Sequence, residues 1–300
     1  RWRRLVRPLL QEIDDRPAPD ANDQYLLLQT ILGAWPMAML DGAAAADCKD
    51  FLARLEAYAE KALREAKRHS SWLSVHTGYE AATKQLLARL IVPGSPFIDT
   101  FAPLARRLAR LGAAASLSRT VLKCTVPGIP DIYQGSEFWD LSLVDPDNRR
   151  PVDYAARLAA LDAAARADPA DLLRDWRSGA VKQALLARLL QLRSAHPALF
   201  ALGDYRPLAV RGPRQRHVLA FMRSAEGARL VVVAGRLFGA LLGDGEDLLP
   251  PVDVWHDTAV DLPPGSWTDV LTGRPAHHGD LRELLARLPV AVLLEKRDGG

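Results

Sequence analysis

The chain has 300 residues, of which 49% are hydrophobic and 25% charged, a composition typical of a soluble globular protein with at least two domains. Its formal net charge is +3, and the arginines that cause it are scattered singly along helical patterns, which indicates solvated helix faces more than a nucleic-acid-binding surface. The densest basic cluster, "RWRRLVR" at residues 1–7, keeps a nucleic-acid-binding protein open as an alternative.

Cysteine usage and hydrophobic run lengths bear on where the protein works. Cys48 and Cys124 have neither metal-ligand nor redox spacing, which favours a reducing, cytoplasmic location. The longest uncharged run, residues 25–40, contains polar residues and a proline and is too short to cross a bilayer, and no signal peptide is recognised, so we expect no membrane association. Because the chain begins at Arg1 within a helical pattern, we expect it to be a fragment of a longer polypeptide.

Residues 1–93 have a helical pattern. Asp20 and Asn22 are candidate N-caps for a helix that runs to Gly33, and a second helix follows Asp47 with a 3.6-residue apolar rhythm. A third helix is predicted over residues 79–91. A long helix at residues 97–126 then leads into "PGIPDIYQG", whose "IPDIY" core, residues 129–133, we interpret as a short buried strand. Two more helices are predicted, one capped by Asp153 and one over residues 181–192.

Beyond about Gly203 the pattern changes. Short β-rich runs such as "HVLAFMR", "RLVVVAGRLF" and "PVAVLLE" alternate with Gly and Pro clusters, which predicts an antiparallel sheet or a small sandwich. The break in composition places a domain boundary near Gly203.

Six carboxylates lie within residues 126–154, interspersed with aromatic residues and turn formers. A polar loop directly after a buried strand is where an α/β barrel carries its chemistry. Carboxylates accept hydrogen bonds from hydroxyl groups and flat rings cover apolar sugar faces, so the combination suits a carbohydrate. The same residue types also build tight turns with Asp–Arg pairs, so a purely structural interpretation stands beside it.

The segment "PGIPDIYQGSE", residues 127–137, resembles the eighth-strand region of the α-amylase superfamily, family 13 of the glycoside hydrolases. The following "FWDLSLVDPDNRRPVDY" and several other stretches in order, among them "YLLLQTILGAWP", "KALREAKRHSSW" and "LPVAVLLE", resemble its trehalose-forming branch. Residues 73–77, "LSVHT", do not match the family pattern. The resemblance implies a multidomain α+β fold: a helical insertion (1–95), the end of a (β/α)8 catalytic barrel with its eighth strand (96–202), and a C-terminal antiparallel β-sandwich domain (203–300).

The resemblance also implies an activity. Members of that branch are isomerases that convert the reducing-end α-1,4 linkage of a malto-oligosaccharide into the α-1,α-1 linkage of trehalose, without a cofactor or metal. An Asp nucleophile, a Glu acid/base and a third Asp carry the reaction, and all three are expected upstream of Arg1. No Gly-x-Arg-x-Asp nucleophile signature occurs in the 300 residues. The "WHDT" at residues 255–258 imitates the third acid's motif but comes too late in the chain. We therefore expect a C-terminal part without catalytic acids, whose partners are the oligosaccharide and the upstream polypeptide.

The candidate substrate-binding residues are those of the strand end and loop together with a second group at the end of the second helix. For Arg149, a structural pairing with Asp145 or Asp147 is equally open, and cations near Lys67 are favoured by helix-end carbonyls in any case. His277 and His278 lack ligand partners at metal spacing. A free-standing glucan-binding module is the second alternative function. The candidates are Asp131, Tyr133, Gln134, Glu137, Trp139, Asp147, Arg149, Lys67, His69 and Trp72.

Overall fold

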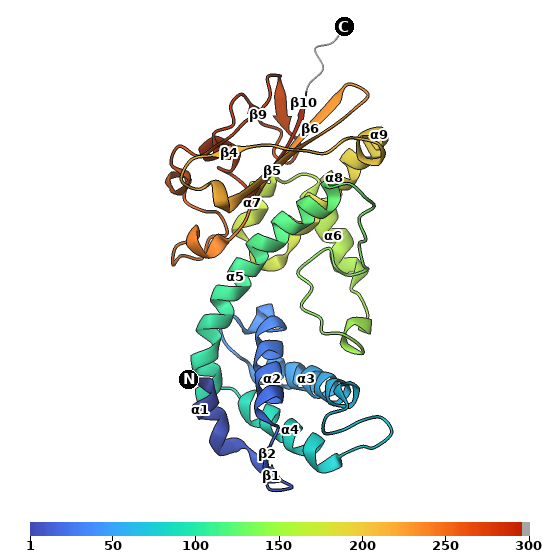
Figure 1. Cartoon of the computed structure of the whole chain (residues 1–300), viewed down its shortest axis with the longest axis vertical. Helices are drawn as coiled ribbons and strands as arrows, with labels where there is room; N and C mark the ends of the chain where they lie inside the picture. The colour runs from blue at the N-terminus through green and yellow to red at the C-terminus, as the bar shows by residue number, and fades with distance from the viewer. Residues whose placement is uncertain (296–300) are drawn as a thin grey trace. The chain divides into compact units, whose positions relative to one another are not determined.

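The structure is a computed structural model that describes residues 1–295 (Figure 1). The chain divides into two compact units. The first contains Arg1–Ala109 and Leu141–Pro151, and the second contains Arg110–Asp140 and the chain from Val152 onward. The long helix α5 (Pro96–Thr125) therefore contributes residues to both units. Within the described residues, no helix has the length and apolar character needed to cross a membrane.

The first unit is a helical bundle with a small ribbon (Figure 1). The Asp20 side chain accepts the amide of Asp23 and thereby caps α2, as the sequence predicts. The helix after Asp47 and the helix near residues 79–91 are also confirmed. The elements are α1 (Trp2–Val6), β1 (Gln11–Ile13), β2 (Arg16–Ala18), α2 (Ala21–Gly33), α3 (Ala45–Ala66), α4 (Thr77–Leu90), the first part of α5, and the 3-10 turns η1 (Arg7–Leu9), η2 (Met37–Met39) and η3 (Asp147–Arg149).

Aromatic rings fill the core of the first unit. Phe101 of α5 lies 4.7 Å from Trp2, 5.3 Å from Trp35 and 4.7 Å from Phe97 between ring centroids. The apolar stripe of α3, which includes Phe51 and other buried residues at helical spacing, packs into the same unit. Tilted and stacked ring contacts of this kind bury a large apolar area with defined geometry, so they fix how α1 and α5 pack within the unit.

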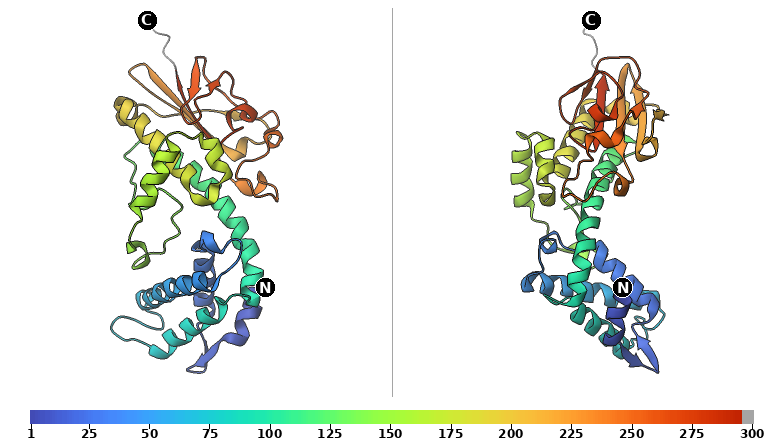
Figure 2. Two further views of the ribbon diagram at one scale, coloured as in Figure 1. Left: turned by 180° about the vertical axis from the view of Figure 1, so that it is seen from behind. Right: turned by 90° about the vertical axis from the view of Figure 1, so that its left-hand side faces the viewer.

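The second unit is built on an antiparallel sheet of six strands in the order β3-β5-β6-β10-β8-β9. The long hairpin β5–β6 and strand β10 lie side by side in Figures 1 and 2, and β6 and β10 are almost wholly buried. This confirms the predicted antiparallel β region. The strands are β3 (Arg206–Pro207), β5 (Val218–Ala225), β6 (Ala228–Gly235), β8 (Trp267–Asp269), β9 (Pro275–Ala276) and β10 (Val290–Glu295), with a separate pair of β4 (Val210–Arg211) and β7 (Ala259–Val260).

Helices of the second unit pack on this sheet through buried side chains. The Ser118 hydroxyl of α5 donates to the carbonyl of Gly235 at the end of β6. The buried Arg223 of β5 donates to the carbonyls of Thr125 and Gly203, so its guanidinium satisfies the end of α5. The helices are the second part of α5, α6 (Tyr154–Ala164), α7 (Pro169–Arg174), α8 (Ala180–Ala195), α9 (Pro197–Ala201) and α10 (Leu281–Leu284), with the 3-10 turns η4 (Trp176–Ser178), η5 (Gln215–His217), η6 (Phe238–Ala240) and η7 (Val252–Trp255).

The strand predicted at residues 129–133 is wrong for this chain. These residues are not assigned to any strand, and Ile129 is 94% exposed. A short apolar pentapeptide becomes a strand only when a neighbouring strand pairs with its backbone. Within residues 1–295 no strand pairs with this segment, so it stays an extended coil. The predicted division at residues 95 and 202 stays a prediction.

Candidate functional site

Five candidate residues, those from Asp131 to Trp139, belong to the second unit and lie on the coil that follows α5. Asp131, Tyr133 and Gln134 are exposed. The phenol of Tyr154 on α6 donates to the side-chain amide oxygen of Gln134, Oε1, at 3.3 Å. Glu137 and Trp139 are half-buried. The first three side chains expected to contact sugar are therefore at the surface. Glu137 and Trp139 are partly covered and are held by neighbouring residues.

Those neighbours come from α6, α8 and the turn before α8. The Arg157 guanidinium donates to the Glu137 carboxylate at 3.0 Å and to the Gly135 carbonyl at 2.8 Å. The Trp139 indole N–H donates to the carbonyl of Trp176 at 2.6 Å. The segment 135–139 is thus held against helices of its own unit, which presents the Trp139 ring in one orientation.

Lys182 on α8 also holds segment 135–139. Its Nζ donates to the carbonyls of Ser136 and Phe138, at 2.6 and 2.7 Å. Burial, with repulsion from Lys123, lowers the pKa of Lys182 to about 8. A lysine with a depressed pKa close to two candidate residues is a typical feature of functional regions, although structural lysines share it.

Asp147 and Arg149 belong to the first unit. The Arg54 guanidinium of α3 donates to both carboxylate oxygens of Asp147, at 2.9 Å each. Burial of Asp147 disfavours its charge, but hydrogen bonds from Arg54 and the Leu143 amide outweigh that effect, so the pKa of Asp147 lies below its usual value. Arg149 is exposed and forms a two-point pair with Asp145. The structural pairing considered for Arg149 is therefore present.

The second group lies on the loop between α3 and α4 in the first unit. Lys67 ends α3 in a left-handed conformation with a φ of 55° and is exposed. Trp72 is 55% exposed, and Leu73 beyond it is fully exposed. The Arg64 guanidinium lies 5.0 Å above the Trp72 ring. The loop therefore presents an aromatic ring that is held on one side by a cation.

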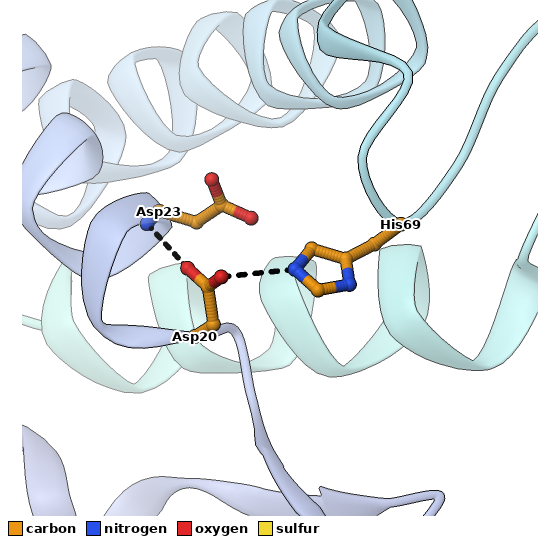
Figure 3. Close-up of side chains that lie close together, drawn as sticks. All are labelled: Asp20, Asp23 and His69. Carbon is orange, nitrogen blue, oxygen red and sulfur yellow. Dashed lines mark hydrogen bonds and ion pairs between the residues drawn. The ribbon is translucent and has the colours of Figure 1, made fainter.

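His69 is held at the base of this loop by residues from α2 and α4. Figure 3 shows Asp20 between the amide of Asp23 and the His69 ring, whose Nε2 is 2.9 Å from Asp20 Oδ2. The His69 ring stacks on Tyr79 with 4.3 Å between centroids. The Tyr79 hydroxyl donates to Asp23 at 2.6 Å and accepts the Asp20 amide at 2.8 Å.

Burial and these hydrogen bonds shift the pKa values of Asp20 and Tyr79. Burial of Asp20 disfavours its charge, but the Asp23 amide and His69 outweigh that effect and lower the pKa of Asp20. Burial, with the bond to the Asp23 carboxylate, raises the pKa of Tyr79. Ligand atoms of Asp20, Asp23 and His69 lie within 4.8 Å of one another and could approach a cation. Asp20 Oδ2 is also 3.3 Å from the Arg68 guanidinium, and we therefore interpret the cluster as an anchor of the loop.

A cavity of about 340 Å³ also lies in the second unit, beside α10 and β10. Its lining includes the buried Asp269 together with Arg282 and Arg287. None of the candidate substrate residues lines it. The cavity therefore adds nothing to the candidate set.

The structure thus places five of the ten candidate residues in each unit, and those of the first unit lie on two different segments. Sequence reasoning missed the residues that hold them, above all Arg54, Arg64, Arg157 and Lys182. The available signal was weak. Lys182 stands in an apolar helical pattern between Val181 and Leu185, and the others look like ordinary residues of a solvated helix face.

Comparison with known proteins gives a consistent result. No family model matches the chain. A Mycobacterium tuberculosis protein that carries the name maltooligosyl trehalose synthase is 39% identical over 279 residues, which are 93% of this chain and 32% of that protein. The solved maltooligosyltrehalose synthase of Arthrobacter ramosus is 34% identical with a TM-score of 0.74, over 98% of this chain and 35% of that one. A hypothetical maltooligosyl trehalose synthase of Sulfolobus tokodaii gives 27%, a TM-score of 0.66, and 98% and 34% coverage. The chain spans about a third of the length of these relatives.

Proposed function

We propose that this chain, which belongs with the maltooligosyltrehalose synthases in sequence and fold, is part of an isomerase that converts the reducing-end α-1,4 linkage of a malto-oligosaccharide into the α-1,α-1 linkage of trehalose. The observation that carries the proposal is that both likenesses run along nearly the whole chain. A shared fold alone would not support an activity, but sequence identity at this level over the same residues does.

The proposed reaction uses two carboxylates. An Asp attacks the anomeric carbon of the penultimate glucose while a Glu protonates the departing O4 of the terminal glucose, which leaves a glycosyl-enzyme. The released glucose turns, and its anomeric hydroxyl attacks the same carbon as the Glu takes back the proton. Exclusion of water decides between isomerisation and hydrolysis. We place these acids and the supporting third Asp on polypeptide upstream of Arg1, so the chain alone should be inactive.

The residues of this chain then serve to bind substrate. We assign Tyr133 and Trp139 to stacking on glucose rings, and Asp131, Gln134 and Glu137 to hydrogen bonds with hydroxyl groups. In the first unit we assign the same roles to Trp72, with His69 and Lys67 beside it. Because the Asp147 side chain is only 2% exposed and Arg149 is paired with Asp145, we propose that these two support the loop.

We further propose that α5 and the helices from α6 to α8 belong to the closing part of a (β/α)8 barrel, and that the strands beyond residue 203 form a C-terminal sandwich-like domain. The resemblance of residues 127–137 to the eighth-strand region of the α-amylase superfamily supports the first point. We place the protein in the cytoplasm because Cys48 and Cys124 are both buried free thiols.

The decisive experiment is complementation. The chain is coexpressed with the upstream part of its reading frame, and products of maltohexaose are analysed for a non-reducing trehalose end. We expect trehalose-capped product from the pair and none from either part. Capped product from this chain alone, or none from a well-folded pair, would contradict the proposal.

Two other functions give different outcomes. A glucan-binding module would bind maltopentaose in the millimolar range or tighter, but no trehalose-capped product would form even with the upstream part present. The half-exposed rings of Trp72 and Tyr133 are the observation in its favour. A nucleic-acid-binding protein would be retained on heparin with a steep salt dependence.

A further inference from the structure

Glu80, at the start of α4, is a buried carboxylate whose hydrogen bonds connect α3 with the loop that carries Trp72. Its side chain is 8% exposed. The Arg64 guanidinium donates to Glu80 through Nε at 2.9 Å and Nη2 at 2.8 Å. The Ser70 hydroxyl donates to Glu80 at 2.5 Å, and the same hydroxyl accepts the His76 amide at 3.0 Å. One carboxylate thus connects both ends of the loop to α3.

Arg64 transmits this arrangement to Trp72. A two-point pair fixes the plane of a guanidinium as well as its position, which a single contact does not. That plane lies over the Trp72 indole, with 5.0 Å between the guanidinium carbon and the ring centroid. The remaining nitrogen, Nη1, is 3.0 Å from Glu60, a more exposed residue of α3. The hydrogen bonds from Arg64 lower the pKa of Glu80, so the carboxylate is charged at neutral pH.

The arrangement leaves much of the Trp72 ring exposed to solvent. Trp72 keeps 55% of its surface in contact with solvent although its ring is contacted by Arg64. An indole loses favourable burial when it is left in water, and a flexible one would collapse onto nearby apolar groups. A ring that is fixed and exposed is ready to stack without losing further side-chain entropy.

We propose that Glu80 is a positioning residue that, through Arg64, fixes the Trp72 indole as a stacking platform for a glucose ring of the malto-oligosaccharide. The inference rests on the proposed function, because it names the ligand from that assignment. Glu80 itself does not touch the sugar. Its effect is on the orientation of the ring that does.

The test uses the 300-residue chain with 15N-labelled tryptophan, whose seven indole N–H groups give separate NMR signals. Trp72→Phe identifies the Trp72 signal. Glu80→Gln keeps the shape of the side chain but removes the charge that holds the guanidinium. Arg64→Lys keeps the charge and removes the planar fork, and it costs less stability because Glu80 keeps a cationic partner. Glu60→Gln is the matched control, since it removes the other, single contact of Arg64. Maltohexaose affinity is measured from the same spectra.

We expect Glu80→Gln and Arg64→Lys to shift and broaden the Trp72 signal and to weaken maltohexaose binding by roughly threefold to tenfold, the range of a lost cation–π contact. Glu60→Gln should leave the Trp72 signal sharp and the affinity within about twofold. An unchanged Trp72 signal in both Arg64→Lys and Glu80→Gln overturns the positioning role. If Trp72→Ala weakens binding and the two positioning variants do not, the inference fails while the proposed function stands. If Trp72→Ala leaves binding unchanged, or no maltohexaose binds, the assignment of Trp72 under the proposed function fails first.

Discussion

Arg54 and Asp147, which are 93 positions apart in the sequence, form a two-point ion pair in which the carboxylate is almost completely buried. The pair attaches segment 141–151 to α3 within the first unit. Arg54 also donates to the Leu141 carbonyl at 2.7 Å, so one side chain contacts this segment at both Leu141 and Asp147.

Asp147→Asn should therefore lower the free energy of unfolding by about 3 kcal/mol, because it leaves the guanidinium without its buried partner. Asp145→Asn is the control on the same loop. Its loss should stay below about 1 kcal/mol, because its partner Arg149 is 72% exposed and its contact with Lys61 is long, at 3.7 Å. Urea denaturation of both variants measures the difference. If both variants lost the same free energy of unfolding, burial of the Arg54–Asp147 pair would not make it more stabilising than the exposed pair.

The same pair predicts a pH dependence. The pKa of Asp147 is lowered in the folded protein from its ordinary value of 3.8. A lowered carboxyl pKa stabilises the folded state fully above the unfolded value, and the contribution is lost as the pH falls through the folded value. The stability difference between the wild type and Asp147→Asn should be constant from pH 7 to about pH 5 and shrink below about pH 4. A difference that does not change down to pH 2 would contradict the assignment.

Lys182 predicts a second rise of stability with pH, in the alkaline range. Its pKa is about 8 when folded and 10.5 ordinarily, so between these values the unfolded chain binds the extra proton. Stability therefore rises with pH across this window. Relative to Lys182→Met, the wild type should gain roughly 2 to 3 kcal/mol between pH 8 and pH 10.5. Lys49→Met, at an exposed position of α3, is the control and should show no such difference.

Gly179 allows Trp139 and Phe138 to approach the start of α8. It has a φ of +78°, and a Cβ there would lie 3.0 Å from the Cβ of Phe138 and 3.1 Å from the Trp139 nitrogen. Gly179→Ala should displace segment 135–139 and weaken any glucan contact of Trp139. Gly273→Ala separates strain from contact, since Gly273 has a φ of +72° and nothing within 4 Å of the added Cβ.

Both alanine variants should lose about 1 kcal/mol to backbone strain, and Gly179→Ala should lose 1 kcal/mol or more beyond that. Thermal unfolding and the indole NMR signal of Trp139 report the two effects. The same loss of stability in both variants, with an unchanged Trp139 signal, would show that the close approach is unimportant.

The Tyr79 hydroxyl connects the start of α2 to α4. Tyr79→Phe leaves the buried Asp23 carboxylate without its 2.6 Å donor and should cost about 1 to 3 kcal/mol. Tyr154→Phe is the matched control, because that ring is 55% exposed and its bond to Gln134 is long, so the cost should stay below about 0.5 kcal/mol. Urea denaturation measures both. A cost for Tyr79→Phe as small as the control's would contradict the buried bridge.

Local patterns in the sequence were enough to predict the longer helices, α2 to α6 and α8, and the antiparallel region. Apolar residues at helical spacing predict α3 and α8, and Asp20 and Asp153 cap α2 and α6 as expected. These features depend on residues a few positions apart, so they are readable without a fold. The resemblance of the loop residues to a sugar-processing family was likewise readable from the sequence, and the comparisons with known proteins confirm it.

The tertiary structure decided what depends on distant residues. Residues 129–133 form no strand in this chain, because pairing needs a neighbouring strand that local sequence cannot supply. Asp147 was predicted to contact substrate, yet it is buried against Arg54. Trp72 was proposed as a contact, but its support by Glu80 through Arg64 could not be read from residues that look like a solvated helix face. The sequence by itself determined which segments form the longer helices, and it predicts which residues contact sugar. Only the tertiary structure decided which of those side chains are held in place and which remain exposed, because a buried ion pair forms only after folding brings its partners together.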